Sequence, residues 1–139
     1  MSFFDSLLKT IVPPKQIVHI DGAGDFDLQI VGESHYQDEL EKITGGKTED
    51  GHRMEVEAML IHDDDNPYDN KAIKVCIEGS LVGHLSQELA REFRNRMDEA
   101  GYPGMSAVCN ALIVGGWYRG GGDEGHFGVR LDLPIYQLF

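Results

Sequence analysis

The sequence contains few cysteines and no long apolar run. Its two cysteines, Cys76 and Cys109, lie in strand-like segments and show no pairing pattern, so we expect buried free thiols in a reducing compartment. No apolar segment approaches the roughly 20 residues needed to span a bilayer. The N-terminus has neither the basic start nor the cleavage site of a signal peptide. We therefore expect a cytoplasmic protein without membrane segments.

The sequence also lacks the residue patterns of a catalytic or metal centre. Its histidines are scattered without zinc-binding spacing, and neither cysteine suits a catalytic pair. Residues 120–125 fit G-x-G-x-x-G in letters, but they lead into a strand, so we interpret them as a hairpin loop. The acidic loop at Asp63–Asp65 lacks the EF-hand glycine and is interrupted by Pro67, which favours turn formation over a cation site, the alternative. We predict no enzyme, no metal and no cofactor.

Basic residues are half as frequent as acidic ones, 12 against 24, which gives a formal net charge of −12. Residues 1–69 hold 16 acids and 5 bases, whereas residues 70–119 hold 5 acids and 6 bases. Nucleic-acid binding relies on phosphate neutralisation, so only the second part is not repulsive to a phosphate backbone. The candidate basic patch there consists of Lys71, Lys74, Arg91, Arg94, Arg96 and Arg119. A solvated mixed-charge helix face explains the three helical arginines as well or better.

The spacing of apolar residues predicts one mainly β domain with two or three helices, and 139 residues are enough for one core. The helix over 34–44 has Ser34 and Gln37 at the spacing of a capping box, and Gly45 is expected to end it. We expect one core in which Ile73, Val75, Val129 and Leu131 pack beneath Leu40, Leu89 and Phe93. The expected strands are 16–20, 26–32, 52–62, 72–77, 79–85, 106–118 and 126–133, and the second helix is 86–100.

The N-terminal segment 2–11 is amphipathic and is stopped by Pro13 and Pro14. We predict that residues 1–25 hold this segment and the first strand, docked on a domain of residues 26–139. The alternative is an arm that binds a protein partner through Phe3, Phe4, Leu7 and Leu8.

Residues 65–77 are the most informative stretch of the chain. Asn66-Pro67 predicts a rigid turn, because proline fixes its own φ and pushes the preceding residue toward extended conformations. The turn carries Tyr68 and Asp69 directly before the strand that begins near Ala72. An aromatic ring and a carboxylate are thus expected on a loop held by strands.

Four fragments, in this order and at this spacing, resemble the HIRAN domain. They are Val31–Tyr36, then Asp65–Asp69 with Ala72–Val75, then Val82–Leu85 with Leu89–Ala90, and finally Phe127–Val129. The resemblance extends from about Phe26 to Leu133. It implies an OB-like antiparallel β-barrel flanked by helices. In eukaryotic helicase-like DNA translocases such domains capture the 3′ end of single-stranded DNA, whereas free-standing bacterial-type members, which this chain resembles, are far less understood.

The resemblance also implies a nucleic-acid-binding site. Tyr68 is expected to stack near the terminal base, and Asp69 to accept a hydrogen bond from the 3′ hydroxyl and to repel a 3′ phosphate. Asn66 is implied as a polar support, and His35 with the adjacent Tyr36 falls at an aromatic stacking position. Lys71 and His84 are implied as phosphate contacts, and Phe127 as an aromatic wall. The chain departs from the eukaryotic pattern where an arginine, an aromatic and a lysine are replaced by Ser34, His35 and Gln87.

Each candidate has a structural alternative. Tyr68 would lid the barrel, and Asp69 would cap the turn through backbone N–H groups. His84 would be an ordinary strand residue, and Phe127 a core residue.

Two functions of different classes follow from these observations. The first is a binding module for single-stranded DNA 3′ ends. The second is an acidic protein-interaction or adaptor domain that does not bind DNA, and an unrecognised hydrolase or metal site is a third. A neutral-to-positive pocket would favour DNA, whereas an acidic pocket with an exposed apolar groove would favour a protein partner.

Overall fold

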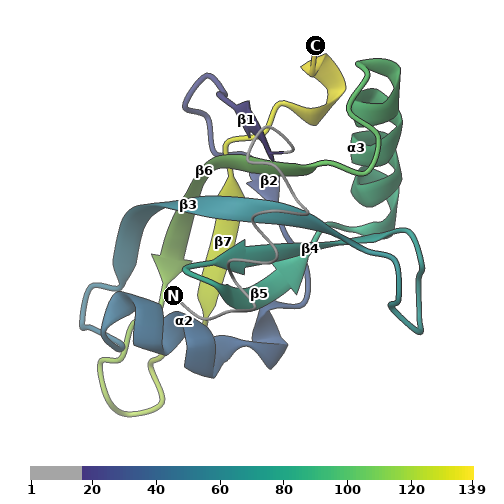
Figure 1. Ribbon diagram of the computed structural model, residues 1–139. Coiled ribbons are helices and arrows are strands. Elements are labelled where there is room, and N and C mark those ends of the chain that lie inside the picture. Colours follow the sequence, from purple (N-terminus) through teal and green to yellow (C-terminus); the bar gives the residue numbers. More distant parts are fainter. Residues whose placement is uncertain (1–16) are drawn as a thin grey trace, which may run out of the picture.

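The computed structural model describes residues 17–139, so the predicted N-terminal amphipathic segment and its partner residues Phe3, Phe4, Leu7 and Leu8 lie outside the described residues. The described part is mainly β. Its strands are β1 (Ile17–Ile20), β2 (Leu28–Gln29), β3 (His52–Asp63), β4 (Ala72–Ile77), β5 (Ser80–His84), β6 (Ser106–Gly115) and β7 (Phe127–Leu131). Its helices are α2 (Gln37–Thr44) and α3 (Gln87–Glu99), with the 3-10 turns η2 (Glu33–His35) and η3 (Ile135–Gln137) (Figure 1).

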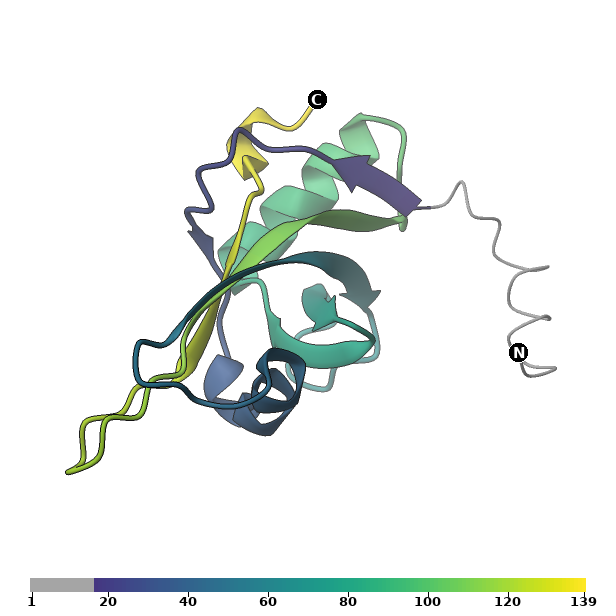
Figure 2. The same cartoon turned by 90° about the vertical axis from the view of Figure 1, so that its left-hand side faces the viewer.

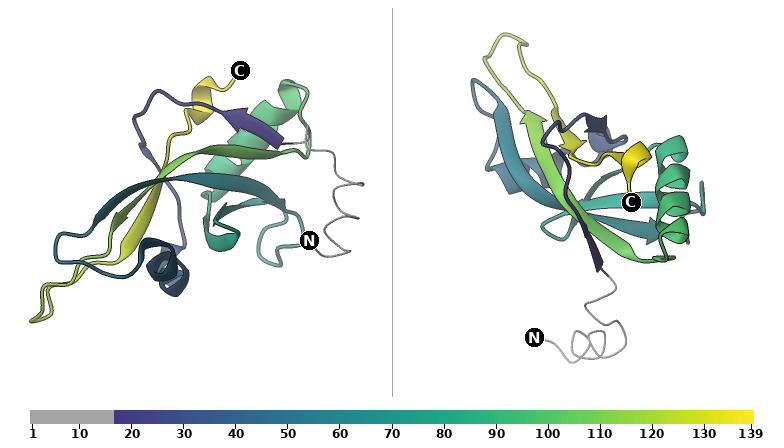
Figure 3. Two further views of the ribbon diagram at one scale, coloured as in Figure 1. Left: turned by 60° about the vertical axis from the view of Figure 1, so that its left-hand side comes forward. Right: turned by 90° about the horizontal axis from the view of Figure 1, so that it is seen from above.

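Two long strands, β3 and β6, organise the sheet. They pair with each other from His52 to Leu60, and the sheet runs in the order β2-β7-β6-β3-β4-β5. The far end of β3 pairs with β4, while the other edge of β6 is shared by β1 and β7. Because the partners change along both strands, the sheet bends into a half-barrel that is consistent with an OB-like fold (Figures 2 and 3). The predicted fold class is therefore confirmed.

One strand pairing differs from the antiparallel expectation. β1 runs parallel to β6, with Ile17 opposite Ser106 and Ile20 opposite Cys109. The other five strand pairings of the described residues are antiparallel. The predicted hairpin of β6 and β7 is among them.

The alternating side chains divide between core and surface as the sequence predicts. In β4, Ile73, Val75 and Ile77 are fully buried, whereas Lys74 and Cys76 are half-buried. Val129, Leu131, Leu40 and Phe93 belong to the same buried cluster, and Leu89 packs against it while half-buried. The predicted core set is confirmed, and one continuous core lies beneath both helices.

The strand predicted over 26–32 is wrong in its length, because only Leu28 and Gln29 pair with β7. Ile30 N makes one more backbone hydrogen bond, to Val129 O at 3.3 Å. Side chains then replace strand pairing, because Glu33 Oε2 accepts a hydrogen bond from Val129 N at 3.3 Å and Gln37 Oε1 accepts one from Phe127 N at 2.8 Å. Gly32 has a φ of 84°, a conformation that favours glycine, and it turns the chain into η2. Polar side chains thus satisfy the edge of β7.

Helix α2 begins later than the sequence predicts, and the capping box of Ser34 and Gln37 is wrong. The N-cap is Tyr36, whose side chain makes no capping hydrogen bond. Gln37 cannot complete a capping box, because its side-chain amide donates to Glu33 O and to Phe127 O in β7. Gly45 ends the helix as predicted, with a φ of 90°. In α3, Ser86 accepts a hydrogen bond from Leu89 N at 3.2 Å, as a helix N-cap should.

Candidate nucleic-acid interface

The loop between β3 and β4 is built around the side chain of Asn66. Its Oδ1 accepts hydrogen bonds from Tyr68 N at 2.9 Å and from Asp69 N at 3.2 Å, while its Nδ2 donates to Asp63 Oδ2 at 3.1 Å. This is the local side-chain-to-backbone bonding by which asparagine stabilises turns. The expected polar support by Asn66 is thus an Asx-type turn that fixes the backbone of the next three residues.

Tyr68 lies at the tip of this turn and is 94% exposed. It does not lid the barrel, so that structural alternative is wrong. The loop projects beyond the sheet next to the start of α3 (Figure 1). A large aromatic ring is therefore held out to solvent on a backbone that is tied down by hydrogen bonds.

Asp69 is already engaged within the protein. Its carboxylate accepts two hydrogen bonds from the guanidinium of Arg91, from Nη1 at 3.0 Å and from Nη2 at 2.9 Å. It also accepts one from Lys71 N at 3.0 Å, so the turn-capping alternative describes part of its role. The side chain is 11% exposed. The hydrogen bonds from Arg91 and from Lys71 N hold the pKa of Asp69 below its usual value.

A second polar cluster lies on the strand side of the loop. His84 Nε2 is 3.4 Å from Asp63 Oδ2, the same oxygen that accepts a hydrogen bond from Asn66. The Asn66 hydrogen bond, with a smaller contribution from His84, lowers the pKa of Asp63. Lys74 faces His84 across the β4–β5 ladder. His84 is thus more than an ordinary strand residue, because it joins β5 to the base of the Tyr68 loop.

The backbone of His84 also reaches the segment that carries His35 and Tyr36. Val31 and His84 exchange two backbone hydrogen bonds, at 2.8 and 2.9 Å. η2 follows directly and ends in His35, which is exposed, and its ring lies edge-on to that of the half-buried Tyr36, with centroids 6.5 Å apart. Both candidate segments therefore lie next to the end of β5.

Phe127 does not belong to this surface. It is 3% exposed, and its ring packs against His52 with a centroid distance of 5.6 Å. The expected aromatic wall would need an exposed ring. The core alternative describes Phe127 instead, because Gly116 and Gln37 hold it at the β6–β7 end of the molecule.

The candidate basic patch is largely neutralised. Arg91 pairs with Asp69, Arg94 with Asp64, Arg96 with Glu92 and Arg119 with Asp123. Arg119 also lies in the β6–β7 loop, away from α3 (Figure 2). Within residues 17–139, Lys71 and Lys74 are the members of the patch that make no ion pair. The mixed-charge interpretation of the helix face therefore describes its arginines.

A groove of about 620 Å³ lies between the loop and α3. Its basic lining residues are Lys71, Arg91 and Arg94, and its acidic ones are Asp64 and Asp98. Asn70, Asn95, Gly104 and His62 complete the lining. The groove is thus polar and carries both charges, in contrast to the strongly acidic chain as a whole.

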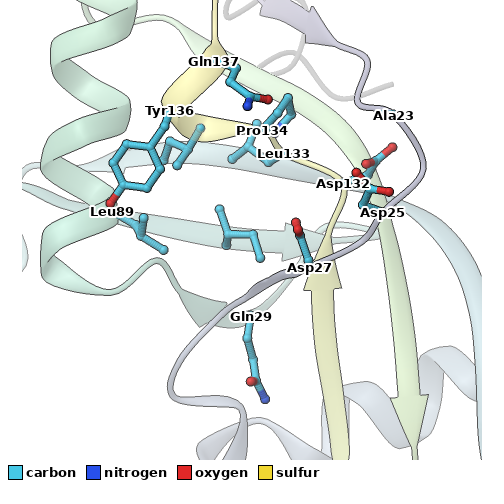
Figure 4. Close-up of a pocket in the computed structure, with 12 residues that line it drawn as sticks. Ala23, Asp25, Asp27, Gln29, Leu89, Asp132, Leu133, Pro134, Tyr136 and Gln137 are labelled. Carbon is cyan, nitrogen blue, oxygen red and sulfur yellow. The ribbon is translucent and has the colours of Figure 1, made fainter.

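A second hollow, of about 470 Å³, lies between η3, the N-terminal end of α3 and the loop after β1 (Figure 4). Asp25, Asp27 and Asp132 line one side, and Leu89 and Tyr136 lie on the other. Among residues 17–139, no basic residue lines it. Asp132 is 5% exposed and accepts a hydrogen bond from Gly24 N, so it also fixes the loop. This hollow repels phosphate.

The acidic loop and the thiols show no arrangement for metal or nucleophile chemistry. Asp63, Asp64 and Asp69 each face a different partner, and no group of His, Cys, Asp or Glu in residues 17–139 could hold a metal ion. Both cysteines are free, and burial raises the pKa of Cys109 to about 12 and raises that of Cys76. In the described part of the chain, no helix is long and apolar enough to cross a membrane.

A protein-family model matches the part of the chain that contains most of these strands, both helices and the Tyr68 loop. The model of the HIRAN domain matches residues 23–111, more than half of the 139-residue chain. The chain belongs to the HIRAN domain family. HIRAN domains are nucleic-acid-binding modules. No curated protein and no solved structure matches the chain. The HIRAN match includes the Tyr68 loop, η2 and β5, and it ends within β6.

The sequence does not predict two of the contacts that build this site. The sequence predicts Asp63 as a turn-forming acid, whereas in the structure it links Asn66 to His84. The sequence predicts Arg91 as a member of the basic patch or as one charge of a mixed-charge helix face, whereas in the structure it binds Asp69 across 22 residues of sequence. The available signal was its place one helical turn after Gln87, a position at which the HIRAN resemblance had already implied a missing cation.

Proposed function

We propose that this HIRAN domain binds single-stranded DNA by its 3′ end, with the terminal nucleotide at the loop between β3 and β4. The observation that carries the proposal is the exposure of Tyr68, 94%, on a turn fixed by Asn66. Base stacking on an exposed aromatic ring contributes about 1–3 kcal/mol per base and tolerates any sequence. An ordered loop also loses little entropy when the strand binds.

The elements beside the Tyr68 loop offer positive charge and further aromatic rings to a strand. Lys71 and Lys74 supply positive charge where the loop leads into β4, and His84, which lies opposite Lys74, also pairs with Val31 before η2. His35 and Tyr36 offer further rings on the η2 side. Few cations face the strand, so stacking rather than phosphate neutralisation supplies most of the affinity.

A substitution of Tyr68 tests this function. Tyr68→Ala should weaken binding of a short 5′-labelled oligothymidylate by about 1–3 kcal/mol, measured by fluorescence anisotropy at low salt. Tyr68→Phe should bind as the wild type does, because the ring remains. The matched control is Tyr118→Ala, which removes a 57% exposed ring from the β6–β7 loop and should leave affinity unchanged. Equal affinity of Tyr68→Ala and Tyr118→Ala would contradict the proposal.

The hollow of Figure 4 favours a second candidate function. Its acidic and apolar walls suit a basic, partly apolar segment of a protein partner. This is the adaptor role, and it does not require the Tyr68 loop. Absence of single-strand binding by the folded wild-type protein would make it the preferred function.

A further inference from the structure

Arg91 is bound to Asp69 and yet keeps part of its hydrogen-bonding capacity. A guanidinium group carries five N–H donors in a planar arrangement. Two of these bind the Asp69 carboxylate, and a third, on Nη1, donates to Gln87 O at 3.2 Å. The Nε–H and the second Nη2–H have no acceptor among residues 17–139. These two groups form one edge of the guanidinium, which matches two oxygens of a phosphate.

This edge is accessible and lies in a polar setting. The side chain of Arg91 is 48% exposed and lines the groove between the loop and α3. Lys71 lines the same groove and makes no ion pair in the described part of the chain. Asn70 and Asn95 add neutral donors, whereas Asp98 is the acid of the groove without an ion-pair partner among residues 17–139. Arg94 uses its Nε–H and its Nη2 donors on Lys71 O, Asp64 Oδ1 and Ala72 O. Arg91, which keeps the Nε–H edge of its guanidinium, and Lys71 are therefore the cations that offer donors to the groove.

The same ion pair limits what Asp69 offers to a hydroxyl group. A carboxylate has about four lone-pair positions, and three of those of Asp69 are occupied by Arg91 and by Lys71 N. Its charge is balanced by the guanidinium at 2.9 Å. A 3′ hydroxyl would gain one hydrogen bond to a partly buried oxygen, while a phosphate would no longer meet an uncompensated carboxylate. The sequence-based expectation that Asp69 rejects a 3′ phosphate assumed an unpaired carboxylate.

We propose that the end site of this protein accepts a terminal phosphate monoester, a 3′-phosphorylated strand end, and that Arg91 determines this specificity. The inference rests on the proposed function, since it places the strand end at the Tyr68 loop. Arg91 holds Asp69 with one edge of its guanidinium and binds the phosphate with the other, and Lys71 contributes the second positive charge. A terminal phosphate monoester carries more charge than a backbone diester, so it gains more from both cations.

The test compares two strands that differ only at their 3′ ends. Anisotropy titrations use 5′-labelled oligothymidylates that end in a hydroxyl or in a phosphate. The wild type should bind the phosphate end at least as tightly as the hydroxyl end. Arg91→Gln should weaken the phosphate strand by about tenfold and reverse the preference, because a charge-assisted, two-pronged contact is lost. Arg91→Lys should recover only part of this loss, since an ammonium group lacks the planar fork.

The matched control is Arg96→Gln on the same helix. Arg96 pairs with Glu92 and does not line the groove, so the ratio of the two affinities should stay at its wild-type value. Thermal unfolding of each variant confirms that it is folded. A wild type that clearly prefers the hydroxyl end, or an Arg91→Gln variant with an unchanged ratio, would overturn the inference.

A second measurement separates this inference from the proposed function. Thymidine 3′-monophosphate and thymidine are titrated while the NMR signal of the Arg91 Nε–H is followed. A shift with the monophosphate alone supports the phosphate site even if neither strand binds, a result that would contradict only the single-strand function. Strand binding without a shift, or neither strand binding nor a shift, would contradict the phosphate site.

Discussion

At the scale of single residues, the loop between β3 and β4 combines one solvent-exposed side chain with several that are hydrogen-bonded within the protein. The side chain of Asn66 is hydrogen-bonded to the backbone of the turn and that of Asp69 to Arg91, whereas the ring of Tyr68 contacts solvent. The bonded residues therefore position the exposed one. Asn66 is a positioning residue in this account, and its contribution can be measured as stability.

Asn66→Ala should lower the free energy of unfolding by about 1 kcal/mol, because the amide groups of Tyr68 and Asp69 lose their acceptor and Asp63 loses a donor. Chemical denaturation monitored by tryptophan fluorescence measures the change. The control, Asn70→Ala, alters the same loop at a side chain that makes no hydrogen bond within the described residues, and it should change stability by less than about 0.5 kcal/mol. Equal effects of the two substitutions would exclude this role of Asn66.

At the scale of elements, the site depends on how the end of β5 meets the segment before η2. Val31 and His84 exchange backbone hydrogen bonds, and this close approach needs a residue without a side chain at Gly83. A Cβ at position 83 would lie 2.7 Å from both Ile30 Cδ1 and Val31 O. The glycine thus allows the η2 segment to lie against β5.

Gly83→Ala should destabilise the domain by about 1–3 kcal/mol, as overpacking of a well-packed site does. The comparison is Gly128→Ala in β7, where a Cβ would make ordinary contacts at 3.6 Å to Val114 Cγ2 and 3.7 Å to Glu33 Oε2. That variant should unfold at nearly the wild-type denaturant midpoint. If both variants unfold at the same midpoint, the close approach of β5 and Val31 does not constrain the fold.

Sequence periodicity predicted the elements well because it reports burial. The alternation in β4, the apolar face of α3 and the asparagine turn all follow from neighbours within a few residues. The short β2 and the late start of α2 could not be predicted in this way, because Glu33 and Gln37 bind the backbone of β7 more than 85 residues away. The Asp69–Arg91 pair is likewise tertiary, since it depends on how α3 is rotated against the loop.

At the scale of the whole molecule, the charge distribution sets the mode of binding. The net charge is −12, and the arginines beside the site are paired with acids. Long-range attraction of a nucleic acid is therefore weak. The proposed function therefore rests on a few local contacts, which are the exposed ring of Tyr68 and the lysines Lys71 and Lys74 that follow it in the chain. Binding should accordingly depend little on salt.

The central claim is that a surface around Tyr68 binds single strands. Its most direct test measures the affinity of the wild-type protein for an oligothymidylate at several salt concentrations and compares it with the affinity for a duplex of the same length. With Lys71 and Lys74 as phosphate contacts, the logarithm of the association constant should fall against the logarithm of salt with a slope between about −1 and −2, and the duplex should bind far more weakly. Lys71→Gln should make the slope shallower by about 0.7, whereas Lys47→Gln, whose lysine pairs with Glu124, should not change it. Absence of binding at low salt, or equal affinity for strand and duplex, would contradict the account.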